Sequence, residues 1–199
     1  MNKLQRILRI GGAFLLCAAV ALAVFNLADA HRAGADADRV RTALIGHVQL
    51  AQGEREEEIA PTLPESEPVA VTVDEQSYIG VIELPRLNLS LPVASDWDYD
   101  ALQDAPCRYA GSPYSDGFVI CAHNYYSHFG RIGELNPGDI ARFTDCEGRV
   151  YTYRVADAET LAPGEIARMT DSGYALTLFT CNWNGTARVT VRFDRVEES

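Results

Sequence analysis

The chain has 199 residues and a formal net charge of −11 at pH 7, from 28 acidic and 17 basic side chains. This length fits one domain of ordinary size plus appendages. The acidic balance argues against nucleic acid as a partner, because nucleic-acid binding calls for a clustered basic face.

The first feature along the chain is an uncharged apolar run at residues 10–28. At about 1.5 Å per residue, a helix of this length nearly spans a hydrocarbon layer of roughly 30 Å. Lys3, Arg6 and Arg9 precede it. The positive-inside rule then keeps the amino terminus in the cytoplasm. We therefore expect residues 1–29 to be a cytoplasmic tip and a single-pass anchor in the cell membrane.

A cleaved signal peptide is the alternative, because Ala28-Asp29-Ala30 fits a small-x-small cleavage site. The apolar run is longer than the usual apolar region of a signal peptide, which favours an uncleaved anchor. Under either interpretation the rest of the chain lies outside the cytoplasm.

Residues 30–73 are predicted to be a stalk and linker between the membrane anchor and the rest of the chain. Residues 30–60 are polar with a thin apolar stripe, which predicts a helical stalk. Pro61, Pro64 and Pro68 then mark an extended linker.

Residues 74–199 show short apolar runs bounded by turn residues. Strands are expected at 78–84, 89–94, 117–122, 140–144, 149–156, 175–180 and 187–196. Short helices or turns are expected at 98–104, with Asp98 as a possible N-cap, and at 163–169. Gly148 permits the positive φ of a hairpin turn. Many short strands with few helices predict an all-β barrel or sandwich.

Cys181 directly follows the expected strand 175–180. The turn sequence Asn182-Trp183-Asn184-Gly185 comes after it, so the cysteine lies at the end of the strand. A cysteine there can act as a nucleophile, although a buried structural cysteine is the usual alternative. His123 also follows a strand and is the leading proton partner, ahead of His128 in the next loop.

A cation completes this candidate site. Arg188 opens the last strand, and Arg192 faces the same side of a period-2 strand. Arg188 is closer to the turn that carries Cys181, so we expect it to lower the thiol pKa or steady an oxyanion. A surface cation or a salt bridge is the expected role of Arg192.

There are five cysteines. Cys17 lies in the apolar segment, and an oxidising compartment permits a disulfide among Cys107, Cys121 and Cys146. If Cys181 is the nucleophile, at most one bridge forms, and the sequence leaves its partners open. No cysteine or histidine cluster has metal-ligand spacing, so no metal is predicted.

The run Thr177-Leu178-Phe179-Thr180-Cys181, followed by Arg188, resembles the sortase signature TLxTC plus arginine. The pair His123-Asn124 and the segment Leu135-Asn136-Pro137-Gly138-Asp139 extend the resemblance over roughly residues 75–199. The resemblance implies an eight-stranded β-barrel with a Cys-His-Arg site and no cofactor. Ala122 stands where glycine is usual, and the subclass stays open.

The resemblance implies the activity of the sortases of Gram-positive bacteria, which cleave an LPxTG-like motif near the end of a secreted protein. A thioacyl enzyme forms, and an amine of a cell-wall peptide or a pilin resolves it. The matching threonine, Thr180, helps to shape the substrate pocket in that family. Asn124, Tyr125 and Trp183 are weaker candidates for substrate binding, since they lie on the loops beside the site.

Two alternatives remain. A secreted cysteine peptidase would use the same residues but only hydrolyse; papain-like enzymes place the cysteine before the histidine, the reverse of the order here. A membrane-anchored β-domain that binds without catalysis would make Cys181 and His123 structural.

Overall fold

The computed structural model describes residues 3–55 and 67–196. The chain divides into two compact units, Met1–Arg32 and Ala33–Ser199. The helices are α1 (Lys3–Arg55), α2 (Tyr99–Asp104) and α3 (Ile166–Thr170), with short 3-10 turns η1 (Pro85–Leu87) and η2 (Ile132–Glu134). The strands are β1 (Val71–Val73), β2 (Gln76–Leu84), β3 (Leu89–Ala94), β4 (Cys107–Ala110), β5 (Phe118–Cys121), β6 (Ile140–Asp145), β7 (Val150–Leu161), β8 (Leu176–Cys181) and β9 (Arg188–Arg195).

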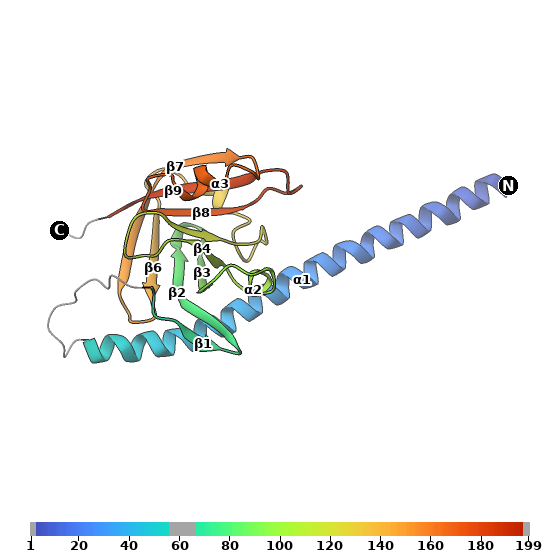
Figure 1. Ribbon diagram of the computed structural model, residues 1–199. Coiled ribbons are helices and arrows are strands. Elements are labelled where there is room, and N and C mark those ends of the chain that lie inside the picture. Colours follow the sequence, from blue (N-terminus) through green and yellow to red (C-terminus); the bar gives the residue numbers. More distant parts are fainter. Residues whose placement is uncertain (1–2, 56–66, 197–199) are drawn as a thin grey trace. The chain divides into compact units, whose positions relative to one another are not determined.

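Eight strands close into a barrel (Figure 1). Their order is β2-β3-β4-β5-β8-β9-β7-β6, and pairing of β6 with β2 completes the ring. The short strand β1 adds to the edge of β2. Most neighbours are antiparallel, whereas β3–β4 and β5–β8 run parallel. The predicted eight-stranded all-β barrel is confirmed.

The elements found from apolar patterning largely match the structure. Asp98 caps α2, because its side chain accepts a hydrogen bond of 3.1 Å from the backbone N–H of Asp100. Gly148, with φ of 82°, sits in the predicted hairpin turn between β6 and β7. The sequence did not predict β4 or β1. Both are short, and pairing with their longer neighbours β5 and β2 defines them.

Side chains of β8 alternate between two apolar clusters. Leu176 and Leu178 belong to the larger cluster, which also holds Phe118, Phe143 and other side chains of the barrel core. Phe179 belongs to the second cluster. Because successive side chains of a strand point to opposite faces, the side chain of Cys181 lies on the Phe179 face.

One face of α1 within Ala33–Ser199 packs on the barrel, with Ala37 in the larger cluster and Val40 and Leu44 in the second cluster. Its buried side chains are Ala33, Ala37, Val40, Leu44 and Val48. Val40 and Leu44 share that cluster with Tyr78 and Val81 of β2. Spacings of three and four residues place these side chains on one helix face. The stripe in the predicted stalk is therefore a packing surface.

The amino-terminal part of α1 is apolar and exposed. Large side chains such as Phe14 and Leu15 are about 70% accessible, at 73% and 69%. By length and composition this helix is able to cross a membrane. Pro61 and Pro64 of the predicted linker lie outside the described residues. Their predicted roles stay untested.

Candidate active site

Cys181 is the last residue of β8 and is half-buried. A tight turn follows it, in which the backbone N–H of Asn182 and that of Ala187 each make a hydrogen bond of 3.0 Å to the other residue. Gly185 has φ of 73°, a conformation that favours glycine. This turn returns the chain directly into β9, so the residues flanking it are neighbours across two strands.

Arg188 lies directly opposite Cys181 in the antiparallel β8–β9 pair. Directly opposed residues point to the same face, with Cβ atoms about 5 Å apart. The Arg188 Nη1 atom donates to the carbonyl oxygens of Gly185 at 3.3 Å and Ala187 at 3.2 Å. These bonds hold the guanidinium at the mouth of the β8–β9 turn, on the same face as the thiol.

His123 is brought alongside by the parallel strand β5. Cys121 pairs with Phe179, and the Ala122 N–H donates to the Phe179 carbonyl oxygen at 3.3 Å. The β5–β8 pairing ends there, and the same register continued for two residues would bring His123 beside Cys181. Since parallel neighbours are about 4.8 Å apart, this register places the imidazole and the thiol at the same edge of the barrel.

The loop after His123 is tied to the loop after Cys181. Asn124 Nδ2 donates to the Asn182 carbonyl oxygen at 3.4 Å. The ring centroid of Tyr125 lies 5.1 Å from that of His123. A Cβ atom on Gly130 would lie 2.5 Å from the Asn124 carbonyl oxygen, so the loop closes tightly there.

His128, the alternative proton carrier, is fully buried. Burial lowers its pKa to about 4, an effect that the nearby backbone of Ala33 opposes. Its ring centroid is 5.6 Å from that of Tyr125. A fully buried imidazole cannot reach a substrate, so the geometry favours His123.

Arg192 is buried, and an ion pair and several hydrogen bonds hold its side chain in place. Its side chain is 1% exposed, and Nη2 donates to Glu159 at 2.8 Å. Nη1 donates to the Thr177 hydroxyl at 2.9 Å and to the Met169 carbonyl at 3.2 Å. This network anchors β9 to β8, β7 and α3, and it leaves Arg188 as the cation at the Cys181 end.

The other cysteines of residues 67–196 are buried. Burial raises the pKa of Cys107 to about 12 and that of Cys146 to about 11, and it raises the pKa of Cys121 as well. Such thiols are poor nucleophiles, because the reactive species is the thiolate. Cys181 is the partly exposed one in this part of the chain.

The weaker candidates occupy different environments. Thr180 is buried on the barrel side of β8, and Trp183 is 97% exposed on the turn. A row of aromatic rings, which the sequence analysis missed, leads away from Phe179. Tyr109 lies 5.2 Å from Phe179, and Trp97 lies 6.3 Å from Tyr109, ring centroid to centroid. Tyr109 lies on β4, which was not predicted from the sequence.

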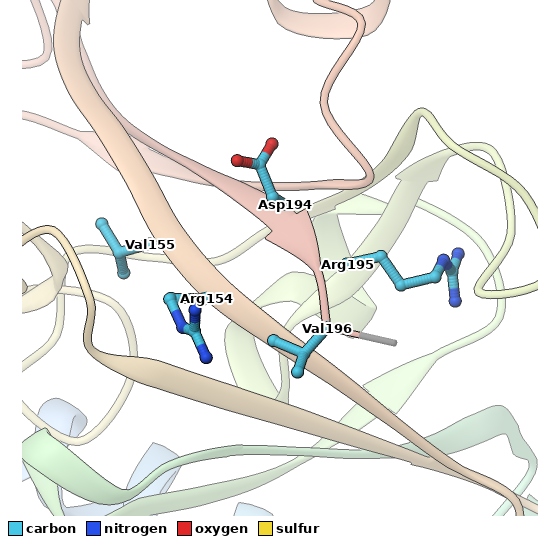
Figure 2. A pocket seen from close by; sticks show the side chains of 5 residues that line it. All are labelled: Arg154, Val155, Asp194, Arg195 and Val196. Carbon is cyan, nitrogen blue, oxygen red and sulfur yellow. The ribbon is translucent and has the colours of Figure 1, made fainter. Parts of the chain in front are cut away.

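A cavity of about 450 Å³ lies elsewhere, beside the paired strands β7 and β9 (Figure 2). Its lining comes from Arg154, Val155, Asp194, Arg195 and Val196. These residues are at the opposite end of β9 from Arg188, so the cavity is separate from the thiol. Within residues 3–55 and 67–196, no three His, Cys, Asp or Glu side chains gather as metal ligands would.

A family model described as the sortase domain matches residues 82–196, more than half of the chain. The chain belongs to the sortase family. Sortase D of Bacillus subtilis (strain 168) is 32% identical over 78 residues. That alignment covers 38% of this chain and 39% of the Bacillus protein, so the chain matches about two fifths of the length of this relative.

Solved sortases share the fold. A Clostridium perfringens sortase D5 transpeptidase superposes with a TM-score of 0.61 at 15% identity, covering 82% of this chain and 99% of that one. A Clostridium perfringens sortase C bearing a C-terminal cell wall sorting motif gives a TM-score of 0.55 at 22% identity, with coverages of 81% and 91%. The eight-stranded barrel of this sortase is therefore the family's barrel.

Proposed function

We propose that this chain is a membrane-anchored, extracytoplasmic cysteine transpeptidase. The observation that carries the proposal is the register of three strands. Cys181 lies directly opposite Arg188 on β9, and the parallel pairing of β5 with β8, which ends two residues before His123 and Cys181, supports their proximity. A nucleophile, a proton carrier and a fixed cation on one edge are the groups that thiol acyl transfer needs.

In the first half-reaction the Cys181 thiolate attacks the carbonyl carbon of a Thr–Gly-type peptide bond. Arg188 stabilises the oxyanion, because its guanidinium offers several N–H donors on the face that holds the thiol. His123 gives a proton to the leaving amine as the C–N bond breaks. The products are a thioester on Cys181 and the released carboxyl-terminal fragment.

In the second half-reaction an amine attacks the thioester. His123 removes a proton from that amine, a new amide bond forms as the C–S bond breaks, and Cys181 leaves as the thiolate beside the protonated His123, which restores the starting pair. The thioester retains the acyl group in activated form, so the exchange needs no nucleotide and no cofactor.

The proposed substrate is a secreted protein with an LPxTG-like sorting motif near its carboxyl end. Support comes from the Clostridium perfringens sortase C structure, which contains a C-terminal cell wall sorting motif. The proposed acceptor is an amine of a peptidoglycan precursor or of a pilin. Thr180, Asn124, Tyr125 and Trp183 are proposed to shape or line the substrate site.

The proposed organisation keeps the amino terminus in the cytoplasm. Residues 1–29 anchor the chain in the cell membrane, residues 30–73 form the stalk and linker, and residues 74–199 carry out catalysis. The apolar, exposed part of α1 supports the anchor. Packing of Val40 and Leu44 on the barrel supports a stalk that is attached to the catalytic part.

The full chain in detergent micelles tests the proposal. It is incubated with LPxTG-like peptides and an amine acceptor, and products are followed by mass spectrometry. Acceptor-linked product is expected, and Cys181→Ala and His123→Gln should abolish it. His47→Gln, at an exposed position of α1, is the matched control and should retain activity.

The alternatives give different products. Free carboxylic acid without acceptor-linked product, over a range of amines, would favour a peptidase that only hydrolyses. If no peptide turns over and Cys181 stays unlabelled by a small thiol reagent in the folded chain, the proposal is wrong. A binding module with a structural Cys181 would then be the better interpretation.

A further inference from the structure

Two cysteines that the proposed chemistry does not use face each other across a pair of strands. Cys107 of β4 and Cys121 of β5 are direct partners in the antiparallel ladder. Directly opposed residues in such a ladder have Cα atoms about 4.5 or 5.5 Å apart. Both separations lie within the range of about 4.4–6.8 Å found for disulfides.

The two side chains also share one face and one environment. Cys107 is 0% exposed and Cys121 is 3% exposed, and both belong to the second apolar cluster. The Cys121 Sγ atom lies 3.7 Å from the Cys107 carbonyl oxygen, so its side chain reaches across to β4. In the structure both are thiols.

Cys146 is placed differently. It follows β6, whose partners are β2 and β7, and its Sγ atom lies 3.2 Å from the Tyr78 carbonyl oxygen. No cysteine stands opposite it in either pairing within residues 67–196. The three buried cysteines that the sequence leaves equivalent are thus resolved into one facing pair and one single thiol.

We propose that Cys107 and Cys121 form a disulfide in the exported protein. The bond closes the chain between residues 107 and 121 and joins β4 to β5 two residues before His123. The proposal rests on the extracytoplasmic location proposed above, but not on catalysis by Cys181.

The chemistry requires an oxidant. The two thiols lose two electrons and two protons as the S–S bond forms. A disulfide of an extracytoplasmic thiol–disulfide oxidoreductase accepts them and becomes two thiols. Burial raises the pKa of both cysteines, so neither forms a thiolate readily once β4 and β5 are packed. Exchange therefore occurs during folding, and the finished bond is shielded from reductants.

Peptide mapping of the full chain, exported from a Gram-positive host, tests the bond. Free thiols are alkylated in denaturant at low pH before trypsin digestion. Cleavage after Arg86, Arg108 and Arg131 separates Cys107 from Cys121, and further arginines place Cys146 and Cys181 on other peptides. We expect peptides 87–108 and 109–131 to run as one species, 2 Da below their sum, until a reductant is added.

The same map contains the opposing results. Alkylated Cys107 and alkylated Cys121 on separate peptides would overturn the proposal, and so would a bridge from either one to Cys146. In Cys107→Ala, alkylation of Cys121 should appear while that of Cys146 stays the same. In Cys181→Ala the bridge should persist, which separates this proposal from the proposed catalytic function.

A stability measurement gives a second test. Chain refolded from denaturant with reductant should melt about 5–10 °C below the exported chain, because the bridge restricts the unfolded chain. A Cys107→Ala, Cys121→Ala double variant should show no such difference between the two preparations. Equal melting temperatures for the two wild-type preparations would contradict the bridge.

Discussion

The Thr180 hydroxyl donates a hydrogen bond of 2.8 Å to the backbone carbonyl oxygen of Ala122. These residues immediately precede Cys181 and His123, so the bond joins the two strand ends that carry the proposed nucleophile and proton carrier. Thr180 is 3% exposed, and no substrate can reach its hydroxyl without displacing this bond. Its position therefore favours a role in aligning the site.

Removing the Thr180 hydroxyl should separate alignment from side-chain volume. Thr180→Val keeps the shape but removes the donor to Ala122, which costs about 1–3 kcal/mol when the buried acceptor loses its partner. We expect transpeptidation to fall further than this loss of stability explains. Thr180→Ser, which keeps the hydroxyl, should retain most activity. Equal activities of the two variants, measured with one peptide and one amine, would contradict the alignment role.

The two arginines of β9 should give opposite phenotypes. Arg188→Met is expected to lower kcat/KM by about 100-fold or more, since it removes an oxyanion donor, with little change in stability. Arg192→Met removes the buried guanidinium that holds Glu159 and Thr177, leaves Glu159 only the exposed Arg168, and should cost about 3 kcal/mol of folding free energy. Urea unfolding and peptide kinetics on both variants distinguish the roles. Strong destabilisation by Arg188→Met would argue for a structural Arg188.

Gly130 closes the loop that follows His123. An added Cβ atom would lie 2.5 Å from the Asn124 carbonyl oxygen and 2.7 Å from that of Tyr125, and backbone cannot yield cheaply. Gly130→Ala should cost about 2–3 kcal/mol by overpacking and should reduce activity. At Gly164 nothing lies within 4 Å of an added Cβ, so Gly164→Ala is the matched control and should leave both unchanged. Melting temperatures of the two variants check the predicted difference in stability.

His128 predicts a loss of stability in acid. Its pKa is about 4 in the folded chain, against an ordinary value of 6.5, because of burial. Below pH 6.5 the His128 imidazole binds a proton in the unfolded chain but stays neutral in the folded chain. The free energy of unfolding therefore falls as the pH drops toward 4, by up to about 3 kcal/mol. His128→Phe should flatten this dependence, because it removes the imidazole that titrates. The free energy of unfolding, measured at pH 4.5 and 7.5, checks this prediction, with the exposed His47→Phe as the control.

The helix α1 contacts the same loop. An added Cβ atom on Gly34 would lie 3.0 Å from the Ser127 Cβ atom, whereas one on Gly46 of the same helix meets nothing within 4 Å. Leucine favours helix over glycine at both positions. Gly34→Leu should nevertheless push the His123 loop from its place and lower kcat/KM about tenfold or more. Gly46→Leu should leave kcat/KM unchanged; a matching loss there would point to a general effect on the helix.

The amino-acid sequence by itself determined the local features of this sortase. Alternating apolar runs located most barrel strands, and Asp98 and Gly148 marked a helix cap and a turn through purely local chemistry. The apolar run at 10–28 and the placement of Cys181 and His123 after strands are also local facts. All of these depend on residues within one turn or one strand of each other.

The tertiary structure decided which distant residues meet. Strand register placed Arg188 opposite Cys181 and buried Arg192 against Glu159, and it paired Cys107 with Cys121. The strand β4 is defined by its pairing with β5. The apolar side chains Val40 and Leu44 of α1 pack against residues of β2. These contacts join segments separated by up to tens of residues. Their free energy comes from packing and hydrogen bonding across strands, which no local pattern encodes.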